Sequence, residues 1–163
     1  MQRYYLKQAV FSLRDSFKVF DESQRVVYHA HAKMLSISRQ YNIYRSSDER
    51  LLFTMKRRLL SFMPVYELCD AAGRQVAIMR KRFAMFKNRI DIEAEGRGYL
   101  LEGNIWAHNF TVSSDGKPVL TVRKKLLSWG DTYEIEIAED GDTDKLIAFV
   151  IMIDSIFHRK KSN

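Results

Sequence analysis

One apolar segment near the C-terminal end constrains the fold more than any other feature of the sequence. The run Leu146–Ile153 contains no charged residue, and basic residues follow it closely. Its β-branched residues would allow a strand, but its flanks favour a helix, because Thr143 or Asp144 can cap a first turn and the basic residues suit the negative end of the helix dipole. We therefore expect a helix over about 144–158. Such a helix is apolar on nearly every side and must be enclosed by the rest of the chain.

Alternating apolar and polar residues occupy much of the remaining sequence. The alternation is clear over 28–33, 90–93 and 132–137. Successive side chains of a strand point to opposite faces, so these segments predict strands with one buried and one exposed side. Turn signals separate the strands. They are Asp70–Gly73, Glu95–Gly98, Ser114–Gly116 and Glu139–Gly141.

Three segments repeat one order of features. Residues 17–44, 65–92 and 110–137 each read as an apolar strand, an Asp turn, a second strand, basic residues and a third strand, although the first copy lacks the turn glycine. About ten short strands in meander order are typical of a sandwich or barrel, and a closed barrel also removes exposed strand edges. We predict a mainly β (α+β) single domain over 1–163, with the strands surrounding the C-terminal helix.

Composition indicates a reducing, cytoplasmic location. Cys69 is the one cysteine, so no internal disulfide can form. The N-terminal residues are charged where a signal peptide needs an apolar run. A bilayer span needs about 20 apolar residues, so we expect no transmembrane segment. The net charge of +7 and the pI near 9.5 favour anionic partners, and a peripheral membrane association fits this charge.

Basic clusters are the main candidates for a binding site. Three consecutive basic residues on a strand cannot all face outward, so each cluster is expected at a strand end or in a loop. If the repeats are structurally equivalent, two clusters can meet and bind phosphate or lipid headgroups through Arg forks and Lys charges. A solvated surface without a ligand and a nucleic-acid interface are the alternatives. The clusters are Lys56, Arg57 and Arg58; Arg80, Lys81 and Arg82; Arg123, Lys124 and Lys125; and Arg159–Lys161.

Two further patterns resemble metal sites. His29 and His31 would lie on one strand face, as paired ligands do, but the sequence supplies no third ligand, and exposed imidazoles are the better explanation. Asp142 and Asp144 fall in a segment like the start of a calcium loop, yet Lys145 stands where an EF-hand has glycine. A turn and a helix cap account for both aspartates. We expect no resident cofactor.

Several other residues have ordinary structural explanations. Asp154 interrupts the apolar helix, so it must be protonated or hydrogen-bonded near a barrel mouth. Cys69 is expected to be a passive thiol, and Trp106, Trp129 and Phe83–Phe86 to pack in the core or rim. Nucleophile, phosphate-loop, dinucleotide and zinc-protease motifs do not occur in the 163 residues. Nothing in the sequence therefore points to an enzyme.

The C-terminal segment resembles that of the Tubby-like superfamily. The residues are Asp142-x-Asp144-Lys145 and the apolar run that ends Ile153-Asp-Ser-Ile-Phe157. The resemblance is nearest to the LURP-one-related proteins and the phospholipid scramblases. It implies a closed antiparallel barrel of about twelve strands around a central hydrophobic helix. The chain has no proline-rich region and no cysteine-rich palmitoylation segment like those of many scramblases.

The resemblance supports the fold better than it supports a function. Tubby proteins bind phosphoinositides through basic residues, but those positions have no residue-by-residue match in this sequence. Our leading hypothesis is a non-enzymatic binding or scaffold module for anionic phospholipid or phosphoinositide headgroups. The alternatives are a metal-dependent enzyme that uses His29 and His31, and a nucleic-acid-binding protein whose affinity falls steeply with salt.

Replacing one residue tests the position of the helix. Ile151→Asp places a carboxylate in the middle of the expected core helix, and the uncompensated charge should cost several kcal/mol and prevent stable folding. Thermal unfolding measures the effect. A variant that melts like the parent protein would show that the helix is not buried.

Overall fold

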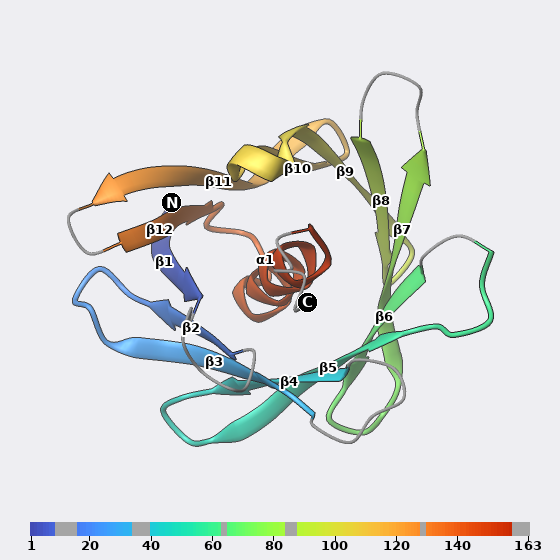
Figure 1. Ribbon diagram of the computed structural model, residues 1–163, viewed down its shortest axis with the longest axis horizontal. Coiled ribbons are helices and arrows are strands. Elements are labelled where there is room, and N and C mark those ends of the chain that lie inside the picture. The colour runs from blue at the N-terminus through green and yellow to red at the C-terminus, as the bar shows by residue number, and fades with distance from the viewer. Residues whose placement is uncertain (9–15, 34–39, 63–64, 84–87, 128–129, 158–163) are drawn as a thin grey trace, which may run out of the picture.

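The protein is a closed barrel of twelve strands around one helix. The computed structural model describes residues 1–8, 16–33, 40–62, 65–83, 88–127 and 130–157. Every strand is antiparallel to its two neighbours, and β1 closes the barrel by pairing with β12 (Figure 1). The strands are β1 (Gln2–Gln8), β2 (Ser16–Phe20), β3 (Val26–Ala32), β4 (Gln40–Arg45), β5 (Arg50–Arg57), β6 (Val65–Asp70), β7 (Gln75–Phe83), β8 (Asn88–Ala94), β9 (Arg97–Asn104), β10 (Asn109–Ser114), β11 (Lys117–Leu127) and β12 (Gly130–Ile137).

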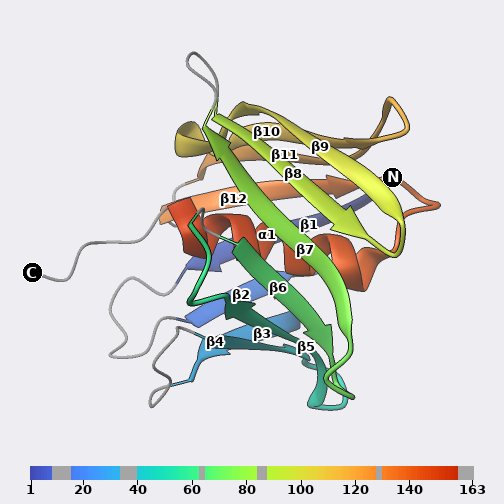
Figure 2. The same ribbon diagram turned by 90° about the vertical axis from the view of Figure 1, so that its right-hand side faces the viewer.

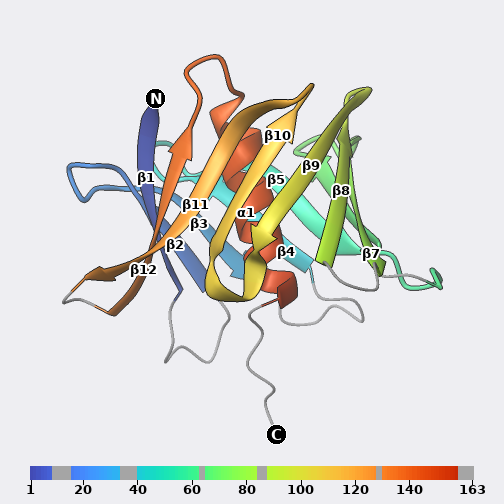
Figure 3. The ribbon, with the colours of Figure 1, turned by 90° about the horizontal axis from the view of Figure 1, so that it is seen from above.

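The two ends of the barrel differ in their connections. A short 3-10 helix, η1 (Ile105–Ala107), joins β9 to β10, and α1 (Thr143–Phe157) runs through the middle of the barrel. We call the end where α1 begins the helix-start end. Six connections lie there: 21–25, 46–49, 71–74, 95–96, 115–116 and 138–142. All odd-numbered strands end at the opposite, helix-stop end, where α1 also ends (Figures 2 and 3).

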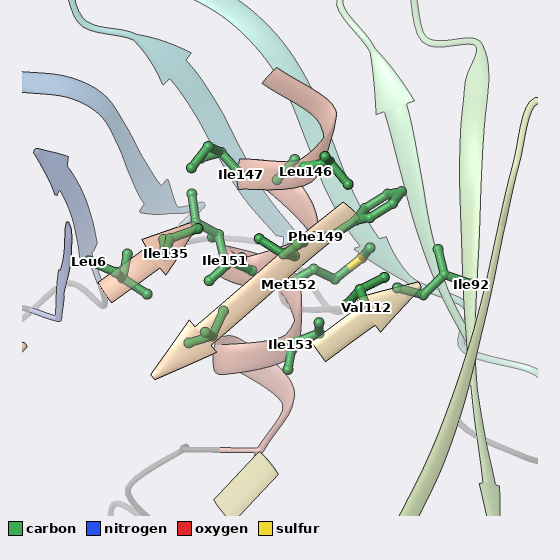
Figure 4. Close-up of a cluster of buried hydrophobic side chains, with 14 of the residues drawn as sticks. Leu6, Ile92, Val112, Ile135, Leu146, Ile147, Phe149, Ile151, Met152 and Ile153 are labelled. Carbon is green, nitrogen blue, oxygen red and sulfur yellow. The ribbon is translucent and has the colours of Figure 1, made fainter. Parts of the chain in front are cut away.

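The helix α1 is buried as its composition predicts. Each residue of the run Leu146–Asp154 is at most 3 % exposed. Figure 4 shows the surrounding strands supplying the contacts, with Ile151 on the side of Leu6 and Met152 on the side of Val112. The predicted helix is confirmed over Thr143–Phe157, and residue 158 lies outside the described residues. No helix in the described ranges is long and apolar enough to cross a membrane.

The alternating segments form strands whose apolar residues face inward as predicted. The outer face of β12 is not exposed as predicted, because Thr132 and Glu134 are 1 % and 7 % exposed, and Glu134 is covered by Arg3 and Lys125. On β12, Tyr133, Ile135 and Ile137 are at most 6 % exposed and point towards α1, and on β8 Ile90 and Ile92 are 1 % exposed. The repeated pattern of three strands, by contrast, underestimates their number. The strands that it omits are β1, β5 and β9.

The barrel therefore consists of units of four strands. The first unit is β2–β5, the second is β6–β9, and the third is β10–β12 with β1 in its fourth place. The expected Asp turns of the first two units have the same hydrogen bonds. Backbone N and Nε of Arg25 donate to Asp21 at 2.9 Å, and those of Arg74 donate to Asp70 at 2.9 and 2.8 Å.

The first copy can lack the turn glycine because another residue adopts its conformation. In both turns the third residue after the aspartate has a positive φ, which glycine adopts at little cost and other residues adopt with strain. The two residues are Gln24 (φ 60°) and Gly73 (φ 82°). The hydrogen bonds of the arginine next in the chain hold Gln24 in this conformation.

Gly103, near the end of β9, allows a close approach between two strands. Its φ is +125°, and a Cβ there would lie 2.6 Å from the Asn109 carbonyl oxygen and 2.8 Å from Phe110 Cα. We expect Gly103→Ala to destabilise the protein by about 1–3 kcal/mol, because both the conformation and the contact are unfavourable.

The matched control lies on the same strand. A Cβ at Gly98 would meet no atom within 4 Å, and the φ of Gly98 is not in the left-handed region. Gly98→Ala should therefore change stability by about 0.5 kcal/mol or less. Urea unfolding measures both variants, and equal midpoints would contradict the role assigned to Gly103.

Candidate functional site

The three basic clusters within the barrel share one end of it. Residues 56–58 lie at the end of β5, residues 80–82 near the end of β7, and residues 123–125 in the last half of β11. Because all three strands run towards the helix-stop end, their basic residues lie in that half of the barrel. β5 and β7 both neighbour β6, whereas β11 is four strands beyond β7. The clusters therefore surround the mouth and do not form one compact patch.

In two of the clusters the middle residue lies on the inner face of its strand. Arg57 comes two residues after the buried Met55, and Lys124 comes two residues after the buried Val122. Both Arg57 and Lys124 are nevertheless exposed. Lys81 has the corresponding place in the second cluster, and its backbone pairs with that of Ile90. The structure does not describe the side chains of Lys81 and Arg82. β5 and β11 thus place Arg57 and Lys124 at the rim of the barrel mouth.

Four of the basic residues in the clusters pair with glutamates on neighbouring strands. These ion pairs are partly exposed, and exposed pairs contribute little to stability. They neutralise part of the positive charge on the outer wall. The pairs are Arg58–Glu67, Arg80–Glu93 (3.2 Å), Arg123–Glu136 (3.1 Å) and Lys125–Glu134 (3.1 Å).

Charge is distributed unevenly between the ends of the barrel. The helix-start connections, the residues next to them and the first turn of α1 carry eleven of the 20 acidic side chains but seven of the 27 basic ones, so the rest of the chain has a large excess of positive charge. The acidic residues are Asp21, Glu22, Asp48, Glu49, Asp70, Glu95, Asp115, Glu139, Asp140, Asp142 and Asp144, and the basic ones are Arg25, Arg45, Arg50, Arg74, Arg97, Lys117 and Lys145.

An open groove of about 620 Å³ lies on the outer wall of the strands β7–β10. It is lined by Arg80 and Arg97 together with more acidic than basic side chains. A groove with this mixture of charges does not favour an anionic ligand. The acidic lining residues are Asp91, Glu93, Glu102 and Asp115.

His29 and His31 lie on the outer face of β3, as predicted from their spacing. Their ring centroids are 5.2 Å apart. His29 is held by other contacts, since Nδ1 is 2.9 Å from Ser46 Oγ and Nε2 is 3.3 Å from Glu49 Oε2. Its ring also stacks on Tyr44. Both nitrogens of His29 therefore have protein partners, and the described residues hold no group of three or more metal-binding side chains.

Asp142 and Asp144 organise the start of α1. Asp144 accepts a hydrogen bond from the Tyr28 hydroxyl at 2.7 Å and forms an ion pair with Arg45. Asp142 accepts from the backbone N of Lys145 at 3.1 Å. These contacts attach the first turn of the helix to β3 and β4. Asp142 therefore caps the helix, whereas Asp144, one of the two predicted caps, lies within the first turn and binds the barrel wall instead.

Lys145 is a charged residue buried beneath this end of the barrel. Its side chain donates to Glu95 at 2.7 Å and lies 3.1 Å from Asp142. Burial lowers the pKa of Lys145, but the hydrogen bonds to Glu95 and Asp142 outweigh that effect and raise the pKa overall. Lys145 therefore keeps its charge at neutral pH.

Asp154 has the hydrogen-bonded position expected near the mouth. His108 Nε2 lies 2.8 Å from Asp154 Oδ1, and both side chains are buried. The His108 ring also stacks on Tyr133, with 3.6 Å between the centroids. Sequence spacing predicts a partner for Asp154 but does not identify His108, which lies 46 positions away.

The remaining candidates are dispersed. Cys69 is buried, and burial raises the pKa of its thiol, so it stays protonated as a passive thiol would. Trp106 is 55 % exposed on η1. The other aromatic and basic candidates, Trp129, residues 84–86 and the cluster 159–161, lie outside the described residues.

Tyr28→Phe tests the attachment of α1 to the wall. Loss of the hydrogen bond to Asp144 should reduce stability by about 1 kcal/mol at pH 7. Burial and the hydrogen bond raise the pKa of Tyr28 well above its usual value of about 10. Above pH 10 the tyrosine ionises in the unfolded chain while the folded protein keeps it neutral, so the wild-type advantage should narrow from pH 10 to 11. Urea unfolding of both proteins from pH 10 to 11 measures the difference in their free energy of unfolding. A difference that does not change with pH would contradict the role assigned to the Tyr28 hydroxyl.

Comparison with known proteins agrees with this architecture. The family model described as LURP-one-related matches residues 2–154, which include all twelve strands and most of α1. A protein from Bacillus subtilis (strain 168), named "Uncharacterized protein YxjI", is 26 % identical over 158 residues, which cover 97 % of this chain and 95 % of that protein. Since the family match spans nearly the whole barrel, the chain belongs to the LURP-one-related family, within the Tubby-like superfamily.

Proposed function

We propose that this protein is a non-enzymatic binding module that docks on anionic membrane surfaces through the helix-stop end of its barrel. One observation carries the proposal: three basic clusters lie towards that end, while the connections at the other end carry an excess of acidic residues. A charge distribution of this kind orients a protein in the field of an anionic surface. Phospholipid and phosphoinositide headgroups both present the phosphate chemistry that Arg and Lys bind.

The exposed members of the clusters support this orientation. Lys56 and Arg57 are exposed, and neither forms an ion pair within the described ranges. A basic residue near an anionic membrane contributes about 1 kcal/mol, and the effect falls off within a Debye length. Several such residues around one mouth are enough for reversible binding.

The filled interior also favours recognition at a surface. Residues of α1 occupy the space that an open barrel would offer to a ligand, and the run Leu146–Asp154 is at most 3 % exposed. A lipid chain therefore has no room within the barrel. Contacts to headgroups at the rim require no such room.

Vesicle co-sedimentation tests the preference for anionic lipid. At moderate salt, we expect binding to phosphatidylcholine vesicles that contain phosphatidylserine or a phosphoinositide, and little binding to phosphatidylcholine alone. The binding should weaken as salt increases. Equal binding to neutral and anionic vesicles would contradict the proposal, and the two anionic compositions distinguish a general charge preference from a preference for phosphoinositides.

Charge-reversal variants test which end binds. Arg57→Glu combined with Lys124→Glu should weaken binding to anionic vesicles by about tenfold or more, because two contributions of about 1 kcal/mol are lost. The control is Arg97→Glu combined with Lys117→Glu, which changes the net charge equally at exposed positions of the helix-start end. Equal weakening by both pairs would mean that net charge alone governs the binding.

A further inference from the structure

Large apolar side chains are exposed immediately after the first basic cluster. Leu59, Leu60 and Phe62 are 60 %, 100 % and 103 % exposed, in the connection from β5 to β6. We call Leu59–Phe62 the apolar tip. Single exposed apolar residues are ordinary, but three in four positions form a patch with a cost in water. Such a patch indicates a surface that becomes covered.

The apolar tip lies at the same end of the barrel as the basic clusters. It follows β5, which ends at the helix-stop end (Figures 2 and 3). Trp106 of η1, 55 % exposed, lies at that end too, between β9 and β10. In the part of the chain that the structure describes, Met1 is the one other large hydrophobic residue that is exposed. Exposed apolar and unpaired basic side chains thus occur together at one end.

We propose that the apolar tip inserts into the bilayer, with Leu60 and Phe62 in the acyl region and Trp106 at the headgroup level. This inference rests on the proposed function and specifies how that function is carried out. Apolar side chains next to Lys and Arg are typical of segments that lie in a membrane interface. Tryptophan prefers the depth of the headgroups. The basic residues 56–58 directly before the tip would remain among the phosphates.

Two observations favour a bilayer over a protein partner. The centres of protein interfaces are depleted in lysine, whereas Lys56 is exposed close to the tip. A second copy of this chain would bring the same basic end to the contact, and like charges would repel. An anionic bilayer satisfies the charges and the apolar side chains together.

Loss of the tip's apolar side chains should weaken membrane binding. Leu60→Ser combined with Phe62→Ser should reduce the affinity for anionic vesicles by about tenfold or more, because burial of such side chains is strongly favourable. Both side chains are fully exposed in the free protein, so the melting temperature should not change. Unchanged affinity would overturn the proposal.

A fluorescent label measures insertion directly. Cys69→Ala provides a background for Leu60→Cys, which is then labelled with nitrobenzoxadiazole. The control places the same label through Ala72→Cys, an exposed position in a turn of the helix-start end. On phosphatidylserine vesicles the label at residue 60 should shift to the blue and be quenched by lipids with spin labels on their acyl chains. The label at residue 72 should do neither.

The outcomes separate this inference from the proposed function. If the protein co-sediments with anionic vesicles but the label at residue 60 shows neither a blue shift nor quenching, insertion is overturned and anionic binding stands. Equal blue shifts on neutral and anionic vesicles would support insertion and overturn the anionic preference. No binding to any vesicle would overturn both. Sedimentation equilibrium tests for a dimer. If the parent protein is a dimer, the Leu60→Ser, Phe62→Ser variant is not, and the label at residue 60 shows no blue shift on vesicles, then the tip makes contacts between protein chains.

Discussion

Enclosure of an apolar helix is the constraint on which the rest of the structure depends. A helix that is apolar all round has no face to present to water, so the wall must surround it completely. Twelve strands with inward apolar residues meet that requirement, and closure of β1 on β12 also removes every strand edge. The polar residues of α1 occur near its two ends. Asp144 and Lys145 bind residues of the barrel at the start of the helix, and Asp154 binds His108 near its end.

The same enclosure determines where the protein can recognise anything. Because the interior is filled, only the outer wall and the two ends of the barrel can bind a ligand or a partner. On the wall, charges alternate across strands, as in the contacts of Arg3 with Glu134 and Glu136, and so cancel locally. The ends are different, because one carries an acidic excess while the other has exposed basic residues beside exposed apolar ones. The chemical contrast between the ends is therefore the strongest functional signal in the molecule.

Local pattern predicted the elements well and predicted their long-range partners poorly. The helix and the alternating strands follow from neighbouring residues, whose periodicity reports burial directly. β5 and β9 were missed because alternation in RLLFTMKR and RGYLLEGN is weak, and β1 because it belongs to a unit at the other end of the sequence. Tyr28 lies 116 positions from Asp144, so no spacing reveals their hydrogen bond. That the basic clusters lie towards one end of the barrel can be seen only from the strand topology.

The place of β1 in the third four-strand unit has a consequence for how the protein is made. β1 pairs on one side with β12, for example Gln2 with Ile137, so until β12 has been synthesised the sheet has two open edges. Pairing between residues so distant in sequence is slow, and unpaired edges invite aggregation. Closure of the barrel must therefore wait for β12, and the strands are made before the helix that they enclose.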